Sequence, residues 1–325
     1  MIRKSAFLGA VALTTLAFAG ASANAETLTL AHSTWVGYGP FYIAQEKGFF
    51  EEEGVDIELT IMENTPLKMG ALMAGQIDIV ASTADEFPIY LSEGIPIKYI
   101  LAVDASKGGD GVVATKDIAT IADLAGKKVA FEEGSVSQFF INALLLDAGM
   151  SQDDIELVNM TATDAGMAFA AGRVDAAVTW EPALSQGANS PNGHLLISSA
   201  ETPGLIVDVI AVTDETLNEH REELAAFVRA WQRALDYLAS NPDESYEIMA
   251  RGVGGWLEDP AAWAETLTGI EYIDLAKNQA LFGTPEEPGQ LYKTVGDGIA
   301  IWTGFGRVPV AVTPQDLIDN SLIAQ

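Results

Sequence analysis

Cysteine is absent from this chain of 325 residues. The absence excludes disulfide bonds, thiolate ligands to a metal and a cysteine nucleophile. It also excludes the lipid anchor that exported bacterial proteins carry on a cysteine at their cleavage site. Any site in this protein is therefore built from other side chains and from the backbone.

Positive charge is scarce. The 17 Lys and Arg residues stand against 46 Asp and Glu residues, which gives a formal net charge of −29. A chain this acidic repels nucleic acid and anionic membranes, so we exclude both as partners. A salty habitat, in which charge repulsion is screened, is one explanation of the acidity. The net charge leaves the charge of a ligand open, because a pocket can be locally positive.

Catalytic and metal-binding patterns are also missing. The three histidines, His32, His194 and His220, do not have the spacing of metal ligands. The chain has no G-x-S-x-G motif, and its glycine-rich stretches GGDG and GVGG do not match a nucleotide-binding loop. We therefore expect a protein without enzyme activity, catalytic residues, metal or cofactor.

The first 25 residues have the pattern of a secretory signal peptide. A basic start with Arg3 and Lys4 precedes the apolar run 6–20, and Ala23-Asn24-Ala25 is a small-x-small cleavage site. Cleavage after Ala25 would leave 15 of the 17 basic residues against all 46 acidic ones, a net charge of −31. No later run of about 18 apolar residues predicts a membrane span. We expect an exported, soluble protein in the periplasm of a Gram-negative bacterium or, alternatively, in the medium.

Residues 28–62 predict one βαβ unit. The apolar run Leu28–Ala31 favours a buried strand. Two glycines and a proline in residues 32–40 cannot continue this strand, so they predict a loop. A helix over Phe41–Glu53 and an alternating strand over Val55–Met62 follow. Ligands of open α/β sheets bind at the carboxyl ends of strands, so the loop is a candidate pocket segment. The alternative is that its aromatic residues pack at a domain edge.

Strand and helix patterns alternate up to about residue 200, which places the chain in the α/β class. The apolar strand Ile206–Val212 follows, interrupted by Asp208. Beyond it the patterns predict helices and no strands, and we expect these helices to pack back onto the first part of the chain. The predicted helices are 219–239, 246–250, 260–267, 288–305 and 314–322. With 49% hydrophobic residues, one large or two medium domains are expected.

Six motifs occur along the chain in a characteristic order. They are W-x-G-Y-x-P-F-Y-x-A-x-E-K-G-F-F-x-x-x-G at 35–54, A-G-Q-I-D-I at 74–79, D-L-A-G-K-K-V-A at 123–130, Gly134-Ser135, A-G-R-V-D-A-A at 171–177 and T-W-E-P at 179–182. In this order the chain resembles the periplasmic substrate-binding proteins of ABC importers for nitrate, taurine and aliphatic sulfonates. That group has relatives that bind thiamine pyrimidines or riboflavin. The resemblance covers residues 28–320.

The resemblance implies the α/β fold of a two-lobe periplasmic binding protein (type II-like), with two hinge crossovers and a helical C-terminal region. Residues 26–108 and 208–325 would form lobe 1, and residues 109–207 would form lobe 2. The segment 104–111, with three glycines in eight residues, would be the first crossover unless it is an ordinary surface turn, and 205–210 would be the return. Closure of such lobes holds a ligand between them.

The resemblance also implies the partners. They are a small-molecule ligand and the permease subunits of an ABC importer, and we expect a monomer without direct membrane insertion. Thiamine-pyrimidine synthases of the same fold carry a cysteine-rich motif, which this chain lacks.

Loops at strand ends supply the candidate ligand contacts of lobe 1. The aromatic loop of the family carries over onto Trp35 and Tyr38, which would stack on a ligand. Ser82 and Thr83 would present hydroxyls where a strand enters a helix. His32 is a further candidate, although a lone histidine is more often a structural residue.

The candidate contacts of lobe 2 follow two of its strands. Gly134–Ser137 lies between a strand and a helix, where free N–H groups, the hydroxyls of Ser135 and Ser137 and the small Gly134 would suit an anion. The alternative is a plain helix cap. Trp180 and Glu181 would face the cleft.

Several candidate residues are acidic, namely Asp85, Glu86, Asp104, Glu181 and Asp208. Burying Asp208 unpaired is costly, so it pairs either with a ligand ammonium or with a protein donor. A bare anion does not suit this set, whereas taurine, a zwitterion, or an aminopyrimidine does. We expect taurine or another sulfonate first, a thiamine pyrimidine precursor or other heteroaromatic amine second, and nitrate, cyanate or bicarbonate third.

Overall fold

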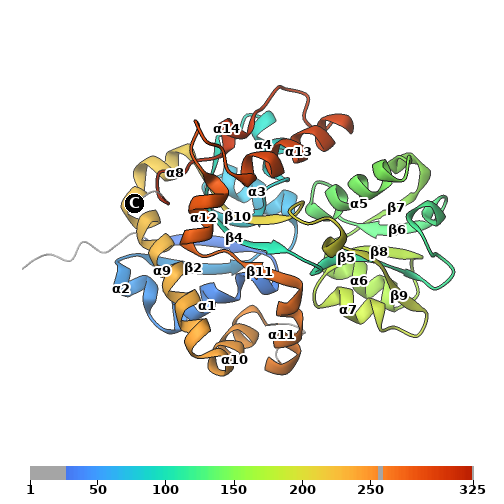
Figure 1. Ribbon diagram of the computed structural model, residues 1–325, viewed down its shortest axis with the longest axis horizontal. Helices are drawn as coiled ribbons and strands as arrows, with labels where there is room; N and C mark the ends of the chain where they lie inside the picture. The colour runs from blue at the N-terminus through green and yellow to red at the C-terminus, as the bar shows by residue number, and fades with distance from the viewer. Residues whose placement is uncertain (1–26, 255–258, 324–325) are drawn as a thin grey trace, which may run out of the picture.

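Two β-sheets organise the chain (Figure 1). The structure is a computed structural model that describes residues 27–254 and 259–323, so the predicted signal peptide lies outside the described residues. The six-stranded sheet has the order β11 (Ile270–Tyr272), β4 (Ile97–Ser106), β10 (Val207–Thr213), β3 (Ile79–Thr83), β1 (Thr27–His32) and β2 (Asp56–Ile61). The five-stranded sheet has the order β7 (Glu156–Asn159), β6 (Lys128–Phe131), β8 (Ala176–Trp180), β5 (Asp110–Thr115) and β9 (Gly193–Ser198).

Helices pack around both sheets, which confirms the α/β class. In the first part of the chain they are α1 (Gly39–Glu46), α2 (Phe49–Glu53), α3 (Thr65–Met73), α4 (Phe87–Ser92), α5 (Val136–Asp147), α6 (Ala162–Ala170) and α7 (Ala183–Ala188). In the C-terminal part they are α8 (Asp214–Glu219), α9 (Arg221–Ser240), α10 (Pro242–Val253), α11 (Pro260–Thr266), α12 (Leu275–Phe282), α13 (Gln290–Gly304) and α14 (Pro314–Leu317). Short 3-10 segments are η1 (Val36–Tyr38), η2 (Ile121–Leu124), η3 (Gln152–Asp154), η4 (Ser199–Glu201) and η6 (Leu267–Gly269).

The structure differs from the predicted elements at several places. Helix α12 lies where no helix was predicted, and the helix predicted over 314–322 ends at Leu317. The helix predicted over Phe41–Glu53 is divided into α1 and α2 at Gly48, which adopts a left-handed conformation with φ of 71°. A strand, β11, lies in the C-terminal region where the sequence predicts helices alone. Its three residues pair with the end of β4, and a segment this short carries no readable alternation.

The chain passes between the two sheets at two adjacent places. Residues 107–109 lead from β4 into β5, and residues 199–206 lead from β9 back into β10. The two crossovers are joined, because Ser199 Oγ lies 2.7 Å from Ser106 Oγ and accepts a hydrogen bond from Gly108 N–H at 2.7 Å. The first crossover is shorter than the predicted 104–111, because β4 and β5 extend into that segment. The second covers 199–206 and not the predicted 205–210, because β9 ends at Ser198 and β10 begins at Val207. The predicted lobe boundaries stay a prediction.

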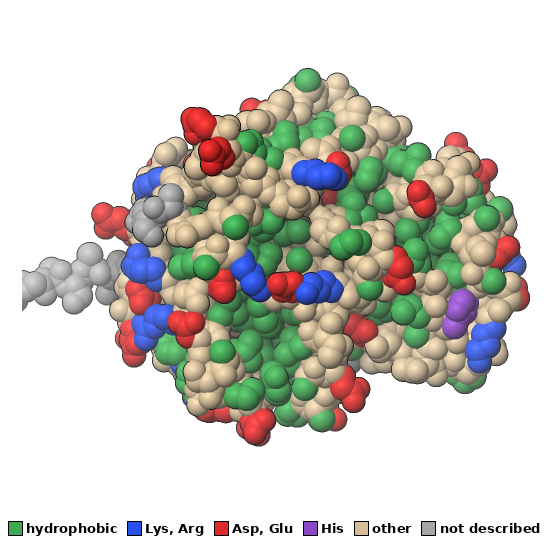
Figure 2. Space-filling view, viewed as in Figure 1, with side chains coloured by type: hydrophobic (Ala, Val, Ile, Leu, Met, Phe, Trp, Pro, Cys, Tyr) green, Lys and Arg blue, Asp and Glu red, His purple; other side chains and the backbone are tan. Residues whose placement is uncertain are grey.

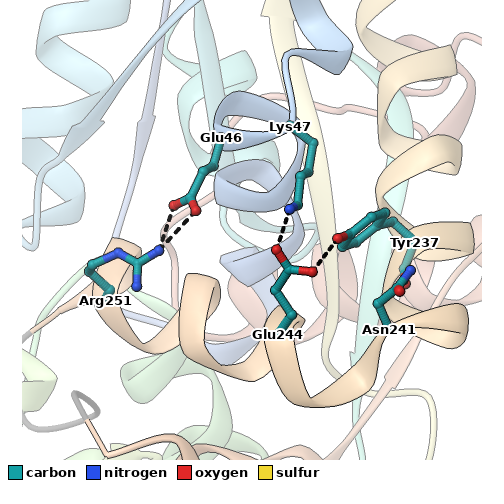
Figure 3. A network of polar contacts seen from close by, with 6 residues as sticks. All are labelled: Glu46, Lys47, Tyr237, Asn241, Glu244 and Arg251. Atoms are coloured by element: carbon teal, nitrogen blue, oxygen red, sulfur yellow. Dashed lines mark hydrogen bonds and ion pairs between the residues drawn. The ribbon is translucent and has the colours of Figure 1, made fainter.

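The C-terminal helices α9 and α10 pack against α1, as the sequence predicts for this region. Polar contacts reinforce this packing at the surface (Figure 3). Arg251 of α10 lies 2.7 Å from a carboxylate oxygen of Glu46, at the end of α1. Glu244 accepts hydrogen bonds from Lys47 and from Tyr237 Oη. These contacts hold in place the helix that follows the aromatic loop.

Apolar packing is continuous between the two sheets. One buried cluster includes Leu30 and Trp35 from the six-stranded side and Val112 and Trp180 from the five-stranded side. Acidic side chains are spread over the face drawn in Figure 2 and do not gather in one patch. Within residues 27–254 and 259–323, none of the helices combines the length and the apolar character that crossing a bilayer requires.

Candidate functional site

A small cavity lies where the two sheets meet. Its lining residues from the six-stranded side are Ser33, Trp35, Tyr38, Thr65, Ser82, Thr83, Glu86 and Asp208, and those from the five-stranded side are Asp110, Val136 and Trp180. The cavity volume is about 30 Å³, room for about two water molecules. A solute of several heavy atoms therefore fits only when the surrounding groups move apart.

The aromatic loop forms one wall of the cavity. After β1 the chain turns through η1 into α1, and Pro40 lies in the first turn of this helix, where a missing N–H costs nothing. Trp35 is 4% exposed, and its Nε1–H donates to the carboxylate of Asp104 in β4 at 3.1 Å. Tyr38, 3% exposed, donates a short hydrogen bond from its hydroxyl to Asp208 Oδ1 in β10. Both aromatic side chains are thus fixed by carboxylates of neighbouring strands.

Glycine is required at position 37 by the close approach of two polar groups. A Cβ on Gly37 would lie 1.8 Å from Asp104 Oδ2 and 2.4 Å from Trp35 Nε1. Neither group can withdraw without breaking the hydrogen bond between them. The spacing W-x-G-Y therefore lets a tryptophan reach a buried carboxylate past a residue without a side chain.

The second wall comes from the end of β8. Trp180 Nε1–H donates to the backbone oxygen of Thr34, in the loop after β1, at 2.8 Å. Trp180 pairs directly with Asp110 in the ladder between β8 and β5. Asp110 follows the first crossover, so the five-stranded sheet brings an aromatic ring and a carboxyl group to the same point of the cavity.

The start of α5 carries the predicted anion cradle, and its N–H groups have protein partners. Val136 N–H donates to Glu86 Oε1 at 2.8 Å, across the boundary between the two sheets. Ser137 N–H donates to Ser135 Oγ at 3.1 Å, and Gly134 N–H donates to Gln138 Oε1 at 2.8 Å. The segment is thus a capped helix start that already holds a carboxylate of the protein.

The end of β3 supplies two hydroxyls. Ser82 Oγ donates a short hydrogen bond to Glu86 Oε2 and accepts one from Lys68 Nζ at 3.3 Å. Thr83 Oγ1 is buried and makes no hydrogen bond of standard geometry among the described residues. It acts on Asp85, because burial raises the pKa of that carboxyl and the Thr83 hydroxyl opposes the shift. Thr83 also pairs with Asp208 in the ladder between β3 and β10. It is therefore a polar group at the cavity that a solute could satisfy.

Six of the predicted contact residues do not line the cavity. They are His32, Asp85, Gly134, Ser135, Ser137 and Glu181. His32 is buried beneath the loop, with Nε2 lying 3.0 Å from Tyr42 Oη and Nδ1 lying 2.8 Å from Ser33 O. Burial lowers the pKa of His32 to about 4, so its ring is neutral at pH 7. Glu181 accepts from Ser185 at 2.7 Å and lines a separate surface hollow beside the first crossover.

One buried cation and four residues that line the cavity were not predicted from the sequence. The lining residues are Ser33, Thr65, Asp110 and Val136. The cation is Lys68 of α3, whose Nζ donates to Ser33 Oγ and to Ala81 O, both at 3.2 Å. Lys68 is three and four residues before the buried Ala71 and Leu72. This spacing, which puts a lysine on the apolar face of a helix, is the signal in the sequence that could have revealed it.

Burial dominates the electrostatics of the cavity. It raises the pKa of Asp208 to about 8 and the pKa of Asp110 to about 7. Burial also raises the pKa of Asp104 well above its usual range, and the neighbouring charge of Asp208 adds to this shift. The pKa of Glu86 is raised by burial, against the opposing effect of the Lys68 charge. Near pH 7 these carboxyl groups therefore keep more bound protons than the same groups would keep in water.

The described part of the chain contains no group of three or more His, Asp or Glu side chains placed to hold a metal ion. The chemistry that the cavity offers is therefore hydrogen bonding, charge and aromatic contact.

The chain is similar in sequence to several known proteins. The family model described as NMT1/THI5 like matches residues 35–245. The taurine-binding periplasmic protein of Escherichia coli strain K12 is 26% identical over 326 residues, with 96% of this chain and 97% of that protein covered. A Haemophilus influenzae protein whose name assigns it to thiamine biosynthesis is 24% identical over 233 residues, with 69% of this chain and 73% of that protein covered.

Solved structures share the fold. The alkanesulfonate-binding protein SsuA from Xanthomonas axonopodis pv. citri, bound to MOPS, superposes with a TM-score of 0.74 at 18% identity. The superposition covers 91% of this chain and 98% of that one. The two-sheet architecture described above is therefore the fold of this binding protein, as the sequence predicts.

Proposed function

The chain belongs to the NMT1/THI5-like family, and from this premise we propose that it is the solute-binding component of an ABC import system. Its ligand in this proposal is a small organic sulfonate, with taurine as the first candidate. The observation that carries the proposal is the cavity, because polar and aromatic side chains of both sheets converge on one enclosed point beside the two crossovers. The similarity to a taurine-binding protein along 96% of the chain supports it.

Binding in this proposal is coupled to closure of two lobes. Residues 26–108 and 208–325 form one lobe, residues 109–207 form the other, and they move about the crossovers 107–109 and 199–206. Opening would break the hydrogen bonds that cross between the sheets, from Trp180 to Thr34 and from Val136 to Glu86. A solute that replaces such contacts with its own would stabilise the closed arrangement.

Each part of the cavity has a role in this proposal. Trp35, Tyr38 and Trp180 enclose the carbon atoms of the solute, and the hydroxyl of Thr83 binds one of its polar atoms. The residues predicted from the sequence but found outside the lining act indirectly. His32, for example, supports the aromatic loop from below through an edge contact with Tyr38, with ring centroids 5.5 Å apart.

The protein binds its solute and does not convert it. The E. coli relative and the SsuA structure are both named as binding proteins. We propose that the chain is exported by residues 1–25, acts in the periplasm as a monomer, and delivers the solute to a membrane permease.

A second candidate ligand is a thiamine pyrimidine precursor or another heteroaromatic amine. Three aromatic side chains line the cavity together with carboxyl groups, a combination that suits a flat ring with an exocyclic amine. The relative named for thiamine biosynthesis points in the same direction.

Thermal unfolding of the mature chain, residues 26–325, against a ligand panel tests the proposal. The panel contains taurine, ethanesulfonate, nitrate, an aminopyrimidine, riboflavin and simple amino acids. A ligand at about 100 times its dissociation constant adds about 2.7 kcal/mol of stability, which a melting curve resolves. A rise in melting temperature with a sulfonate supports the proposal. A rise with the aminopyrimidine alone supports the second candidate, and no rise with any small solute contradicts both.

A further inference from the structure

The charges around the cavity are unbalanced. Glu86, Asp110 and Asp208 line it, and Asp104 lies directly behind Trp35. A buried cation lies nearby, Lys68, and its Nζ donates to Ser33, Ala81 and Ser82. No carboxylate oxygen lies within ion-pair distance of Lys68 among the described residues. The surroundings therefore favour a positive charge inside the cavity over a second negative one.

The place best suited to an anion is taken by the protein itself. A helix N-terminus attracts negative charge, and the first N–H groups of α5 face the cavity region. Glu86 comes from the other sheet, and its Oε1 lies 2.8 Å from Val136 N. The same carboxylate accepts from Ser82 Oγ through its second oxygen. An inorganic anion at this point would have to displace a carboxylate that has two hydrogen bonds.

A second observation points to a ligand in the cavity. Thr83 Oγ1 makes no hydrogen bond of standard geometry among the described residues, in a side chain that is 5% exposed and lines the cavity. Its cross-strand neighbour is Asp208. The aromatic rings of Trp35, Tyr38 and Trp180 line the same space. Carboxyl groups beside aromatic rings form the environment in which protein sites hold organic cations.

We propose that the solute carries a protonated nitrogen, held against Asp110 and Asp208 within the enclosure of Trp35, Tyr38 and Trp180. This inference rests on the proposed function, because it names the ligand class of the same cavity. It separates aminosulfonates, such as taurine, from alkanesulfonates and inorganic anions, which lack a cationic group. In taurine the ammonium group would occupy this subsite, and the sulfonate would lie on the side of Lys68 and Ser82.

Ligand binding should change the number of protons bound by the carboxyl groups of the cavity. Asp208 is surrounded by Tyr38, Asp104, Asp110, Glu86 and Lys68, and Asp110 is influenced by Glu181, Glu86 and Asp208. Burial raises the pKa of Asp110 to about 7 and that of Asp208 to about 8, so both carboxyls are partly protonated at pH 7. An incoming ammonium group favours their charged forms and releases protons, so affinity rises from pH 6 to pH 8. A ligand that is only an anion takes up protons, and its affinity falls over the same range.

The test is calorimetric titration of the mature chain with taurine and with ethanesulfonate, which differ by one ammonium group. Titrations in phosphate and in Tris at pH 7 give the number of protons that are released or taken up on binding. Dissociation constants at pH 6 and pH 8 give the dependence of affinity on pH. We expect taurine to bind at least 10-fold more tightly than ethanesulfonate, with proton release. Asp110→Asn should weaken taurine binding at least 10-fold, reduce the proton release and bring the two affinities together.

Two controls keep the test interpretable. Glu132→Gln removes a carboxyl whose pKa burial also raises to about 7 but which does not line the cavity, so it should retain the preference for taurine. The melting temperature of Asp110→Asn should equal or exceed that of the wild type, because a buried charge is removed, and this shows that the variant is folded.

The outcomes separate this inference from the proposed function. Equal affinities for taurine and ethanesulfonate would overturn the inference and leave the proposed sulfonate function intact. Binding of an aminopyrimidine with proton release, without binding of either sulfonate, would support the inference and overturn the sulfonate function. Binding of nitrate or ethanesulfonate with proton uptake would overturn the inference.

Discussion

The indole of Trp180 donates a hydrogen bond to the backbone oxygen of Thr34 at 2.8 Å. Trp180 ends β8 of the five-stranded sheet, and Thr34 follows β1 of the six-stranded sheet. One side chain therefore lines the cavity and also joins the two halves of the protein across it. The same is true of Glu86, which reaches α5 from the start of α4.

Replacement of Trp180 by phenylalanine should weaken the contact between the sheets. Trp180→Phe retains an aromatic wall but leaves Thr34 O without its donor, which costs about 1 kcal/mol of unfolding free energy. Urea unfolding measures the loss. Trp302→Phe is the matched control, because Trp302 is fully buried and its Nε1 has no partner among the described residues. An equal loss in both variants would show that the Trp180 hydrogen bond does not stabilise the fold.

A methyl group at position 37 should disturb the aromatic loop. Gly37→Ala places a carbon 1.8 Å from Asp104 Oδ2, so Trp35 and Asp104 must separate. Overpacking of this kind costs about 1–3 kcal/mol. We expect a lower melting temperature and weaker ligand binding.

The control for Gly37→Ala is Gly70→Ala. Gly70 lies within α3, and a Cβ there meets no atom within 4 Å, so alanine should stabilise the helix by about 0.5–1 kcal/mol. A Gly37→Ala protein as stable as the wild type would refute the close approach.

Stability should fall as pH rises from 5 to 8 in the absence of ligand. Burial raises the pKa of Asp208 to about 8 and those of Asp110 and Glu132 to about 7, against values near 4 in the unfolded chain. The folded state binds more protons through this range, so the unfolding free energy decreases with pH. His32, with a pKa lowered to about 4, acts in the opposite direction below pH 6.5, but one imidazole opposes three carboxyls.

Scanning calorimetry at pH 5, 6, 7 and 8 checks this dependence. Asp208→Asn should reduce the decrease of stability with pH, because asparagine does not titrate. Asparagine can still accept the hydrogen bond from Tyr38. A melting temperature that increases steadily between pH 5 and pH 8 would contradict the electrostatic account of the cavity.

Loss of the buried cation should be costly. Lys68→Met removes the donor to Ala81 O and to two hydroxyls, and each buried group left unsatisfied costs about 1–3 kcal/mol. Denaturant unfolding should show a loss within or above this range. Lys293→Met, at a position 66% exposed, should change stability by less than about 0.5 kcal/mol. Similar effects of the two substitutions would mean that Lys68 does not support the cavity.

The sequence predicted the parts of the site that depend on strand ends. Trp35, Tyr38, Thr83, Trp180 and Asp208 lie around one cavity because loops and strand ends of both sheets meet beside the crossovers. This convergence follows from topology, which the order of strand and helix patterns reveals.

The contacts that cross between the sheets could not be predicted in this way. Glu86 occupies the start of α5, 50 residues further along the chain, and Lys68 turns inward from α3. Both depend on side-chain positions within an assembled interior, and local patterns do not encode them. Periodicity places Lys68 on a helix face, but only the packed structure shows that its charge lies among hydroxyls and a carbonyl.

The most direct test of the central claim is a crystal structure of residues 26–325 grown with the solute that gives the largest thermal shift. The account predicts density for that solute between Trp35, Tyr38 and Trp180, with its nitrogen within hydrogen-bond distance of Asp110 or Asp208. Density in another hollow, such as the one lined by Thr213, Glu219 and His220 at the end of β10, would contradict it.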